Sequence, residues 1–306
     1  MADFDLRDLE AFVAVARTRN FRRAAVEQRV SVSSLSQRLR DMEERLGVRL
    51  MNRTTRSVAL TEAGELLLGR IGPAMRDVGD ALDQVRGLRD VPSGRLRINA
   101  PAPAVDLVLA PMVTPFLTRH PQIELEIVVQ TSLIDIVEQG FDAGVRYDEH
   151  LAQDMIAMSL GPPQRYAVAA SPAFIAAHGR PRQPKELLGH PCIRTRFESG
   201  AQLDWEFEKA GRVVKVAASG PLLSMHSALQ VKAAIDGLGF VMTFEGYVRE
   251  AVRSGALVSV LEDWCCSFPG PFLYYPSRRQ PPPALSAFVA FVTEWRRQEK
   301  RKAKEA

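Results

Sequence analysis

Short polar side chains that both donate and accept hydrogen bonds are grouped near the N-terminus of this 306-residue chain. Ser33, Ser36 and Gln37 stand close together, and two arginines, Arg38 and Arg40, follow them. Hydroxyl and amide groups pair with the edges of nucleic-acid bases, and arginine pairs with both bases and phosphates. The solvated face of an ordinary surface helix would look similar, so the neighbouring segments have to decide between the two interpretations.

The stretch that carries these side chains is predicted to be one amphipathic helix. Apolar residues at spacings of four, three and four fall on one face at about 100° per residue; they are Leu35, Leu39, Met42 and Leu46. Ser31 is suited to cap the first turn, and Gly47 is suited to end the helix. The polar side chains then point away from the protein interior.

Two shorter predicted helices precede this one. The first runs from Asp5 to about Arg19, and the second follows a capping residue, Asn20. A tight turn at Val30–Ser31 leads into the third helix, which gives the organisation of a helix-turn-helix unit.

A predicted hairpin follows, built from the runs Val48–Asn52 and Ser57–Leu60. Its tip carries Arg53, Thr54, Thr55 and Arg56, and two arginines with two hydroxyls suit phosphate oxygens or a minor groove. A solvated turn is the alternative. The helix-turn-helix immediately before the hairpin favours contact with nucleic acid.

A long helix is predicted after Thr61, with apolar residues that alternate at spacings of three and four. This heptad seam, which is typical of helices that pair, consists of Leu68, Ile71, Met75, Val78, Leu82 and Val85. Pro73 inside the helix predicts a kink. We favour dimerisation through the seam, because a two-fold operator needs two readers. The alternative is that the seam packs on its own chain.

Composition and charge placement narrow the class of protein. The contents of 46% hydrophobic and 25% charged residues are typical of a globular protein, and three cysteines cannot form a disulfide framework. Residues 1–60 hold 12 Arg, no Lys and 8 acidic residues, so they account for the whole net charge of +4. This placement indicates phosphate binding by the N-terminal part.

The sequence was also searched for targeting signals and membrane-spanning segments. The N-terminus lacks the charged and apolar regions of a signal peptide, and no run of 18 apolar residues occurs. We therefore expect a cytoplasmic protein without a membrane partner.

A second domain of about 200 residues begins after a short linker at Val91–Gly94. Strands alternate with helices, and this alternation predicts a parallel sheet with helices on its faces. The first predicted elements are Arg95–Asn99, Asp106–Arg119, Ile123–Gln130, Ser132–Gln139 and Asp142–Tyr147. A second series starts at Tyr166–Ala170.

Catalytic signatures are missing from the chain. It has no GxSxG, HExxH or GxxxxGK[ST] sequence and no GxGxxG after a strand. Five scattered histidines and the absence of a CxxC pair offer no metal-ligand spacing. We expect neither catalytic residues, nor a cofactor, nor a metal site, and hence no enzyme.

The N-terminal block resembles the winged helix-turn-helix of LysR-type transcriptional regulators. The segments that carry the resemblance are DLEAFVAVA, NFRRAAVEQRVSVSSLSQRLRDMEERLGVRL and NRTTRSVALTEAG. SGRLRINAPA, LAPMVTPFLTRHPQIELEI, QGFDAGVRY and AASPAFIAAHGRP are similar to the effector-binding domain of that family. The resemblance implies an α/β fold: an N-terminal winged helix-turn-helix, a long linker helix and a two-lobed effector domain like periplasmic binding proteins.

The resemblance also implies domain boundaries. The DNA-binding domain would be residues 1–60, the linker helix 61–90 and the effector domain 91–300, before a charged tail at 301–306. The lobes would be about 91–163 with 268–300, and 164–267.

DNA-binding positions carry over onto the third helix and the hairpin. The expected set is Val32, Ser33, Ser34, Ser36, Gln37, Arg38, Arg40, Arg53, Thr54, Thr55 and Arg56. Val32 departs from the family, because many members have Gln there; a valine can contact only a thymine methyl or pack. The operator sequence therefore stays open.

Effector-binding positions follow from the logic of binding proteins, in which ligands lie at the C-terminal ends of strands and near helix N-termini. The expected residues are Ala100, Pro101, Ala102, Pro103, Thr131, Ser132, Arg146, Tyr147, Thr195, Arg196, Met225, His226, Ser227, Thr243 and Phe244. Arg146 and Arg196 could hold a carboxylate. The alternatives are a structural ion pair for Arg146 and a simple helix cap for His226.

The resemblance implies a DNA-binding regulator modulated by a small organic effector. Its expected partners are double-stranded DNA with an inverted repeat, the effector, RNA polymerase and further copies of the chain in a homodimer or homotetramer. The runner-up hypothesis is an architectural DNA-binding protein whose second domain senses nothing.

Overall fold

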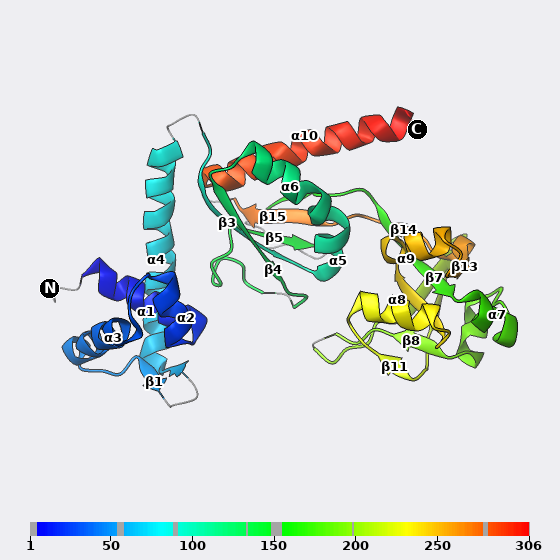
Figure 1. Cartoon of the computed structure of the whole chain (residues 1–306), viewed down its shortest axis with the longest axis horizontal. Helices are drawn as coiled ribbons and strands as arrows, with labels where there is room; N and C mark the ends of the chain where they lie inside the picture. The colour runs from blue at the N-terminus through cyan, green and yellow to red at the C-terminus, as the bar shows by residue number, and fades with distance from the viewer. Residues whose placement is uncertain are drawn as a thin grey trace. The chain divides into compact units, whose positions relative to one another are not determined.

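The computed structural model describes residues 5–53, 58–87, 91–132, 134–147, 155–197, 199–277 and 281–305 (Figure 1). The chain forms two compact units, Met1–Gly94 with Asp135–Phe141, and Arg95–Ile134 with Asp142–Ala306. None of the described helices is long and apolar enough to cross a membrane.

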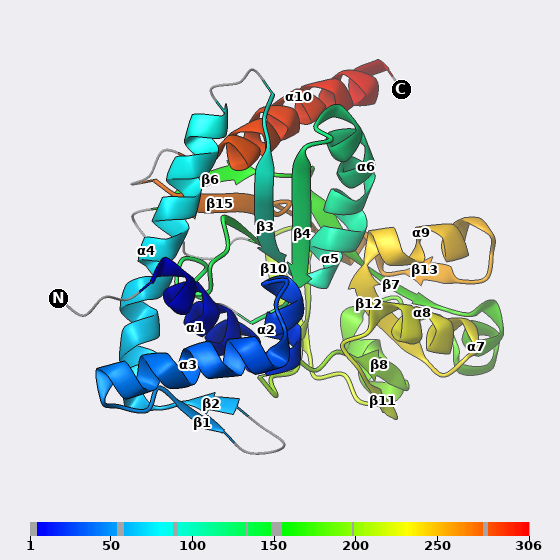
Figure 2. The same cartoon turned by 60° about the vertical axis from the view of Figure 1, so that its left-hand side comes forward.

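The first unit is built from helices and one small hairpin, which Figure 2 shows beside one another. Its elements are α1 (Leu6–Thr18), α2 (Phe21–Glu27), α3 (Val32–Leu46), β1 (Met51–Arg53), β2 (Val58–Leu60) and α4 (Glu62–Gly87). The strands β1 and β2 pair antiparallel.

The predicted helix caps of this unit are confirmed. The side chains of Asp5, Asn20 and Ser31 accept hydrogen bonds from the first-turn amides of α1, α2 and α3. Gly47 ends α3 with a φ of 69°, a left-handed conformation that favours glycine. Thr61 Oγ1 accepts from the amide of Gly64 at the start of α4, 3.1 Å away.

The core of the first unit lies between α1, α2 and α3 and extends to the hairpin and the start of α4. Leu35, Leu39 and Met42 are each 1% exposed, and Leu46 packs at the edge, so the predicted inner face of α3 is confirmed. Ala24 and Ala25 are buried on α2, where their small side chains let the neighbouring helices approach.

The second unit has two lobes, each with its own sheet and hydrophobic core. The first sheet has the order β4-β3-β5-β15-β6. Its elements are β3 (Gly94–Ala100), α5 (Ala102–Ala104), the π-helical segment η1 (Val105–Leu109), α6 (Ala110–Arg119), β4 (Ile123–Val129), β5 (Ala143–Arg146), β6 (Met155–Ser159), β15 (Phe272–Pro276) and α10 (Pro283–Glu305).

Helices α6 and α10 lie side by side against this sheet (Figures 1 and 2). Phe116 of α6 meets Phe288 and Phe291 of α10 edge to face, with ring centroids 5.1 and 5.4 Å apart. Edge-to-face pairs of this kind add stabilisation beyond the apolar area that they bury. The C-terminal helix is therefore part of the first lobe's core.

The second lobe has a sheet of order β11-β8-β12-β7-β13, with β14 paired to β7. Its elements are β7 (Gln164–Ala170), α7 (Pro172–His178), η2 (Pro184–Gly189), β8 (Cys192–Arg194), β9 (Trp205–Lys209), β10 (Arg212–Val216), β11 (Leu222–Leu223), α8 (Ser227–Ile235), β12 (Phe240–Phe244), α9 (Glu245–Arg253), β13 (Val258–Val260), η3 (Glu262–Trp264) and β14 (Ser267–Phe268). Strands β9 and β10 form a separate antiparallel hairpin.

The prediction of α/β architecture is confirmed, but two details of it are wrong. Both sheets are mixed: β3–β5 and β11–β8–β12 are parallel, whereas β15 runs antiparallel to β5, and β7 antiparallel to β12. The chain passes between the lobes twice, at residues 159–164 and 268–272, and each passage adds a strand of opposite direction.

The second difference concerns the predicted helix Ser132–Gln139. Its described residues form a turn instead, in which the side chain of Asp135 accepts from the amides of Val137 and Glu138. The same pair of bonds caps α2 at Asn20, so Asp135 begins a helical turn, and Gly140, at a φ of 73°, ends it after that one turn.

Candidate functional site

The outer face of α3 presents the polar side chains that the sequence singled out. Ser33, Gln37 and Arg40 are exposed, whereas Ser34, Ser36 and Arg38 are half-buried. Val32, at the first position of the helix, is 42% exposed, so its methyl groups are free to touch an apolar group such as a thymine methyl. A helix with this face is able to lie in a major groove.

Gln37 is held by its neighbours on the same helix. Its Nε2 donates to Asp41 Oδ1 at 2.7 Å, and its Oε1 accepts from Arg40 at 2.8 Å. The amide is thereby fixed in orientation. A second N–H of Nε2 and a second lone pair of Oε1 stay available for a base edge.

Two acidic side chains position α3 and the hairpin. Asp8, buried on α1, accepts from Arg45 of α3 at 2.6 Å, which makes Arg45 a structural residue. Glu43 Oε1 accepts from the amides of Leu50 and Met51 at 2.8 and 3.0 Å, which ties the start of the hairpin to α3. Neither role follows from the helical periodicity of the sequence, because the partners of Arg45 and Glu43 lie outside α3.

The tip of the hairpin lies outside the described residues. Arg53 is the last residue of β1, and β2 resumes at Val58. The expected contacts of Thr54, Thr55 and Arg56 with DNA therefore stay predictions. Gly64 helps to seat the hairpin, because a Cβ there would lie 2.1 Å from the carbonyl oxygen of Leu50.

The heptad seam on α4 is divided between two environments. Leu68 packs against the core of its own helix-turn-helix unit, while Ile71 and Met75 are half-buried and Val78 is 45% exposed. The side chains of Leu82 and Val85 lie outside the described ones. The alternative, in which the seam packs on its own chain, therefore applies at Leu68, the first position of the seam.

In the first lobe the expected effector residues gather at the ends of β3, β4 and β5. Ala100 and Pro101 are buried, whereas Ala102, Pro103 and Thr131 are half-buried and Ser132 is exposed. The expected cation, Arg146, is only 2% exposed. It donates to Asn99 Oδ1 at 2.6 Å, to the Ser132 carbonyl at 2.9 Å and to the Val145 carbonyl at 2.7 Å.

These contacts give Arg146 a structural role. Its guanidinium bonds the protein's own oxygens and joins the ends of β3, β4 and β5. The expected contact of Arg146 with a carboxylate of the effector stays a prediction. These oxygens come within reach of Arg146 only when folding brings the ends of the three strands together.

In the second lobe the expected residues surround the N-terminus of α8. His226 Nδ1 accepts from the amide of Leu229 at 3.2 Å, so His226 is a helix cap. Thr195 Oγ1 accepts from Gln230 Nε2 at 2.9 Å, and the same nitrogen donates to the Ser224 carbonyl at 2.6 Å. The buried Gln230 organises this region, although the sequence did not single it out.

The other expected residues of this lobe differ in exposure. Met225 is 38% exposed, and Thr243 is buried at the end of β12. Arg196 is exposed, and its Nε donates to the Gly200 carbonyl at 3.2 Å.

Two tyrosine hydroxyls bridge the lobes. Tyr147 of the first lobe donates to Gln164 Oε1 at 2.9 Å, and Tyr247 of the second donates to Asp106 Oδ2 at 2.7 Å. Burial raises the pKa of both tyrosines, and for Tyr247 the bond to Asp106 raises it further, so both stay neutral donors.

An aromatic cluster adjoins these hydroxyls. Tyr147 lies 5.4 Å from Phe244 and 6.3 Å from Phe268, measured between ring centroids, and Tyr166 lies 5.0 Å from Phe244. The cluster joins both lobes at the point where the chain passes between them. It offers an apolar surface next to polar hydroxyls, which is the usual composition of a small-molecule site.

Metal binding has no support in the described ranges. Within them, no three His, Cys, Asp or Glu side chains are grouped so that they could hold an ion.

Comparisons with known proteins agree with both regions. Residues 6–65 match the family "Bacterial regulatory helix-turn-helix protein, lysR family", and residues 89–297 match "LysR substrate binding domain". The HTH-type transcriptional regulator PgrR of Escherichia coli is 38% identical over 286 residues, which cover 93% of this chain and 96% of that protein.

Two solved structures have the same architecture. The virulence activator AphB of Vibrio cholerae is 25% identical, with a TM-score of 0.65, over 95% of this chain and 99% of that one. The LysR-type regulator CrgA of Neisseria meningitidis is 28% identical, with a TM-score of 0.59, over 95% and 99%.

Proposed function

The chain belongs to the LysR family of DNA-binding transcriptional regulators, and from this premise we propose how it reads DNA and where it senses its effector. Members of this family bind DNA and small-molecule effectors, form oligomers and are not enzymes. The proposal concerns the residues that carry these properties here.

The exposed face of α3 is the reading surface. Leu35, Leu39 and Met42 on its apolar side are buried, which holds Ser33 and Gln37 outward at adjacent turns, and this is the observation that carries the proposal. Gln37 reads a base by its amide, Ser33 and Ser36 by their hydroxyls, and Val32 by methyl contact. The hairpin tip, with Arg53 and Arg56, contacts the sugar-phosphate backbone.

The effector occupies the junction of the lobes. The hydroxyls of Tyr147 and Tyr247 supply polar groups there, and Phe244 supplies an apolar wall. When a polar group of the ligand replaces Gln164 or Asp106 as the partner of a tyrosine hydroxyl, a hydrogen bond that joins the lobes is broken. A small organic molecule with a ring and one or more polar groups suits this lining.

The part of α4 that follows Leu68 pairs two copies of the chain. Ile71, Met75 and Val78 form the described start of a seam for a second copy, and Leu82 and Val85 extend it. Two copies then present two α3 helices to an inverted repeat, and effector-domain pairing makes a tetramer. The protein acts in the cytoplasm beside RNA polymerase, and domain boundaries near residues 60 and 90 separate reading, pairing and sensing.

The variant Tyr247→Phe tests the sensing part. It removes the hydroxyl that bonds Asp106, so we expect about a tenfold loss of affinity for an effector found by a thermal-shift screen of small carboxylates and aromatics. Operator affinity without effector should stay unchanged. Tyr275→Phe, a buried tyrosine of the first lobe, is the matched control.

Two outcomes would contradict the proposal. An unchanged effector response in Tyr247→Phe would place the ligand elsewhere. DNA binding that shows salt dependence but no operator preference would favour the architectural alternative.

A further inference from the structure

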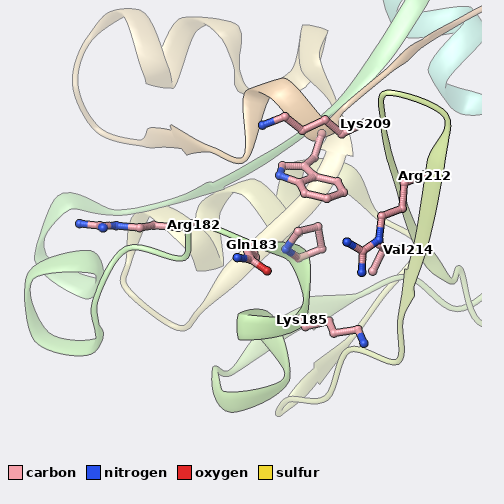
Figure 3. A pocket seen from close by; sticks show the side chains of 8 residues that line it. Arg182, Gln183, Lys185, Lys209, Arg212 and Val214 are labelled. Carbon is pink, nitrogen blue, oxygen red and sulfur yellow. The ribbon is translucent and has the colours of Figure 1, made fainter.

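A further candidate ligand site lies in the second lobe, away from the junction of the lobes. It is a pocket of about 270 Å³ between η2, the β9–β10 hairpin and η3 (Figure 3). Val214, Pro184 and Trp264 form its apolar floor, and Lys185, Lys209 and Arg212 contribute cations to its wall. Arg182 stands at its rim and extends outward (Figure 3).

The cations of the pocket are only partly neutralised. Lys209 pairs with Asp263 and lies over the Trp264 ring, 5.5 Å from its centroid. Among the residues that the structure describes, Lys185 and Arg212 have no acidic side chain within ion-pair distance. The pocket therefore keeps a positive charge that an anion would compensate.

The pairing of strands β9 and β10 makes this positive charge unfavourable for the stability of the hairpin. Arg212 stands directly opposite Lys209, and like charges in that position destabilise a strand pair. Three residues along, Lys215 stands opposite Glu206 and forms an ion pair of 2.9 Å, which is the ordinary arrangement. The turn between the strands also holds Ala210 at a φ of 50°, which is unfavourable for a non-glycine residue.

We propose that this pocket binds a small anion that carries a phosphate or carboxylate group on a planar ring. Lys185 and Arg212 bind the anionic group, and Trp264 stacks on the ring. The volume lies near the lower limit of ligand pockets, about 300 Å³, so the ligand has one or two rings. This site is separate from the junction of the lobes and would give the regulator a second input.

Calorimetry on the full-length protein tests the proposal with three probes that share a naphthalene ring: 1-naphthyl phosphate, 1-naphthoate and the uncharged 1-naphthalenemethanol. We expect the two anions to bind and the alcohol not to. The better of the two anions identifies the group that the site prefers. Arg212→Gln should weaken anion binding about tenfold, because it removes a charge-assisted hydrogen bond. Lys215→Gln, which removes an equal charge from the same strand outside the pocket, should leave it unchanged.

Three results would overturn the proposal. No binding of either anion at millimolar concentration would exclude the site. Equal effects of Arg212→Gln and Lys215→Gln would show that only the general positive field matters. If Arg212→Gln instead weakens binding of duplex DNA without an operator while the anions bind unchanged, the pocket cations contact DNA.

Discussion

Replacing Gln37 by alanine should weaken operator binding and relax the sequence preference at one base pair of each half-site. In the free protein the Gln37 amide bonds Asp41 at 2.7 Å and Arg40 at 2.8 Å. Both bonds are exposed, and each contributes about 0.5 kcal/mol, at the low end for protein hydrogen bonds. Together they hold the amide in place by about 1 kcal/mol, while its second N–H and second lone pair stay available to a base.

The magnitude follows from the strength of base pairing. A bidentate contact of an amide with adenine is worth about 1–3 kcal/mol of discrimination. The alanine variant should therefore lose about 1–3 kcal/mol per half-site, or roughly 5–150-fold. Asp41→Ala should have the opposite sign, because it removes a negative charge that repels phosphate.

Fluorescence anisotropy with an operator selected from random duplexes measures both effects at one fixed salt concentration. Operators with single base substitutions then map the position at which Gln37→Ala no longer discriminates. Gln298→Ala is the matched control, since Gln298 makes the same kind of amide–carboxylate contact with Glu294 on α10. If Gln37→Ala binds the operator and every substituted operator as the parent does, the proposed reading face is refuted.

Three further predictions address the rest of the molecule. Arg53→Ala should weaken binding to all DNA sequences equally and lower the slope of log affinity against log salt by about 1; a change confined to one operator would contradict a phosphate contact. Val78→Glu should give monomers in analytical ultracentrifugation, whereas Leu66→Glu, 69% exposed and off the seam, should not. Arg45→Ala should lower the free energy of unfolding by about 1–2 kcal/mol, because it leaves a buried carboxylate on α1 without its partner. Denaturant titration beside the exposed control Arg49→Ala checks this, and equal losses would argue against the ion pair.

Most of the first unit could be predicted from local sequence patterns. The caps at Asn20 and Ser31, the glycine at the end of α3 and the buried stripe around Leu39 depend on residues within one or two turns. Such patterns act before any tertiary contact forms, so periodicity and capping identify them. The family resemblance then supplied the two-lobed fold of the second unit, which local patterns indicated only as alternating strands and helices.

Strand directions and the turn at Asp135 were less predictable. The alternation of elements indicates parallel strands, but it does not show that the chain crosses between two lobes and returns. The Asp135 carboxylate caps this turn as it would cap a helix, and Gly140, at a φ of 73°, ends it after one turn. A helical pattern in sequence does not show where along the predicted segment the helix begins and ends.

The sequence by itself determined where the reading helix begins and ends, which face it buries and which side chains it exposes. Only the tertiary structure decided what the long polar side chains do. Arg146 bonds Asn99, 47 residues away, and Tyr247 bonds Asp106, 141 residues away. The same holds for Arg212, whose position opposite Lys209 depends on the register of the hairpin. A residue type limits which bonds a side chain is able to make, but the partner is set by segments that only folding brings together.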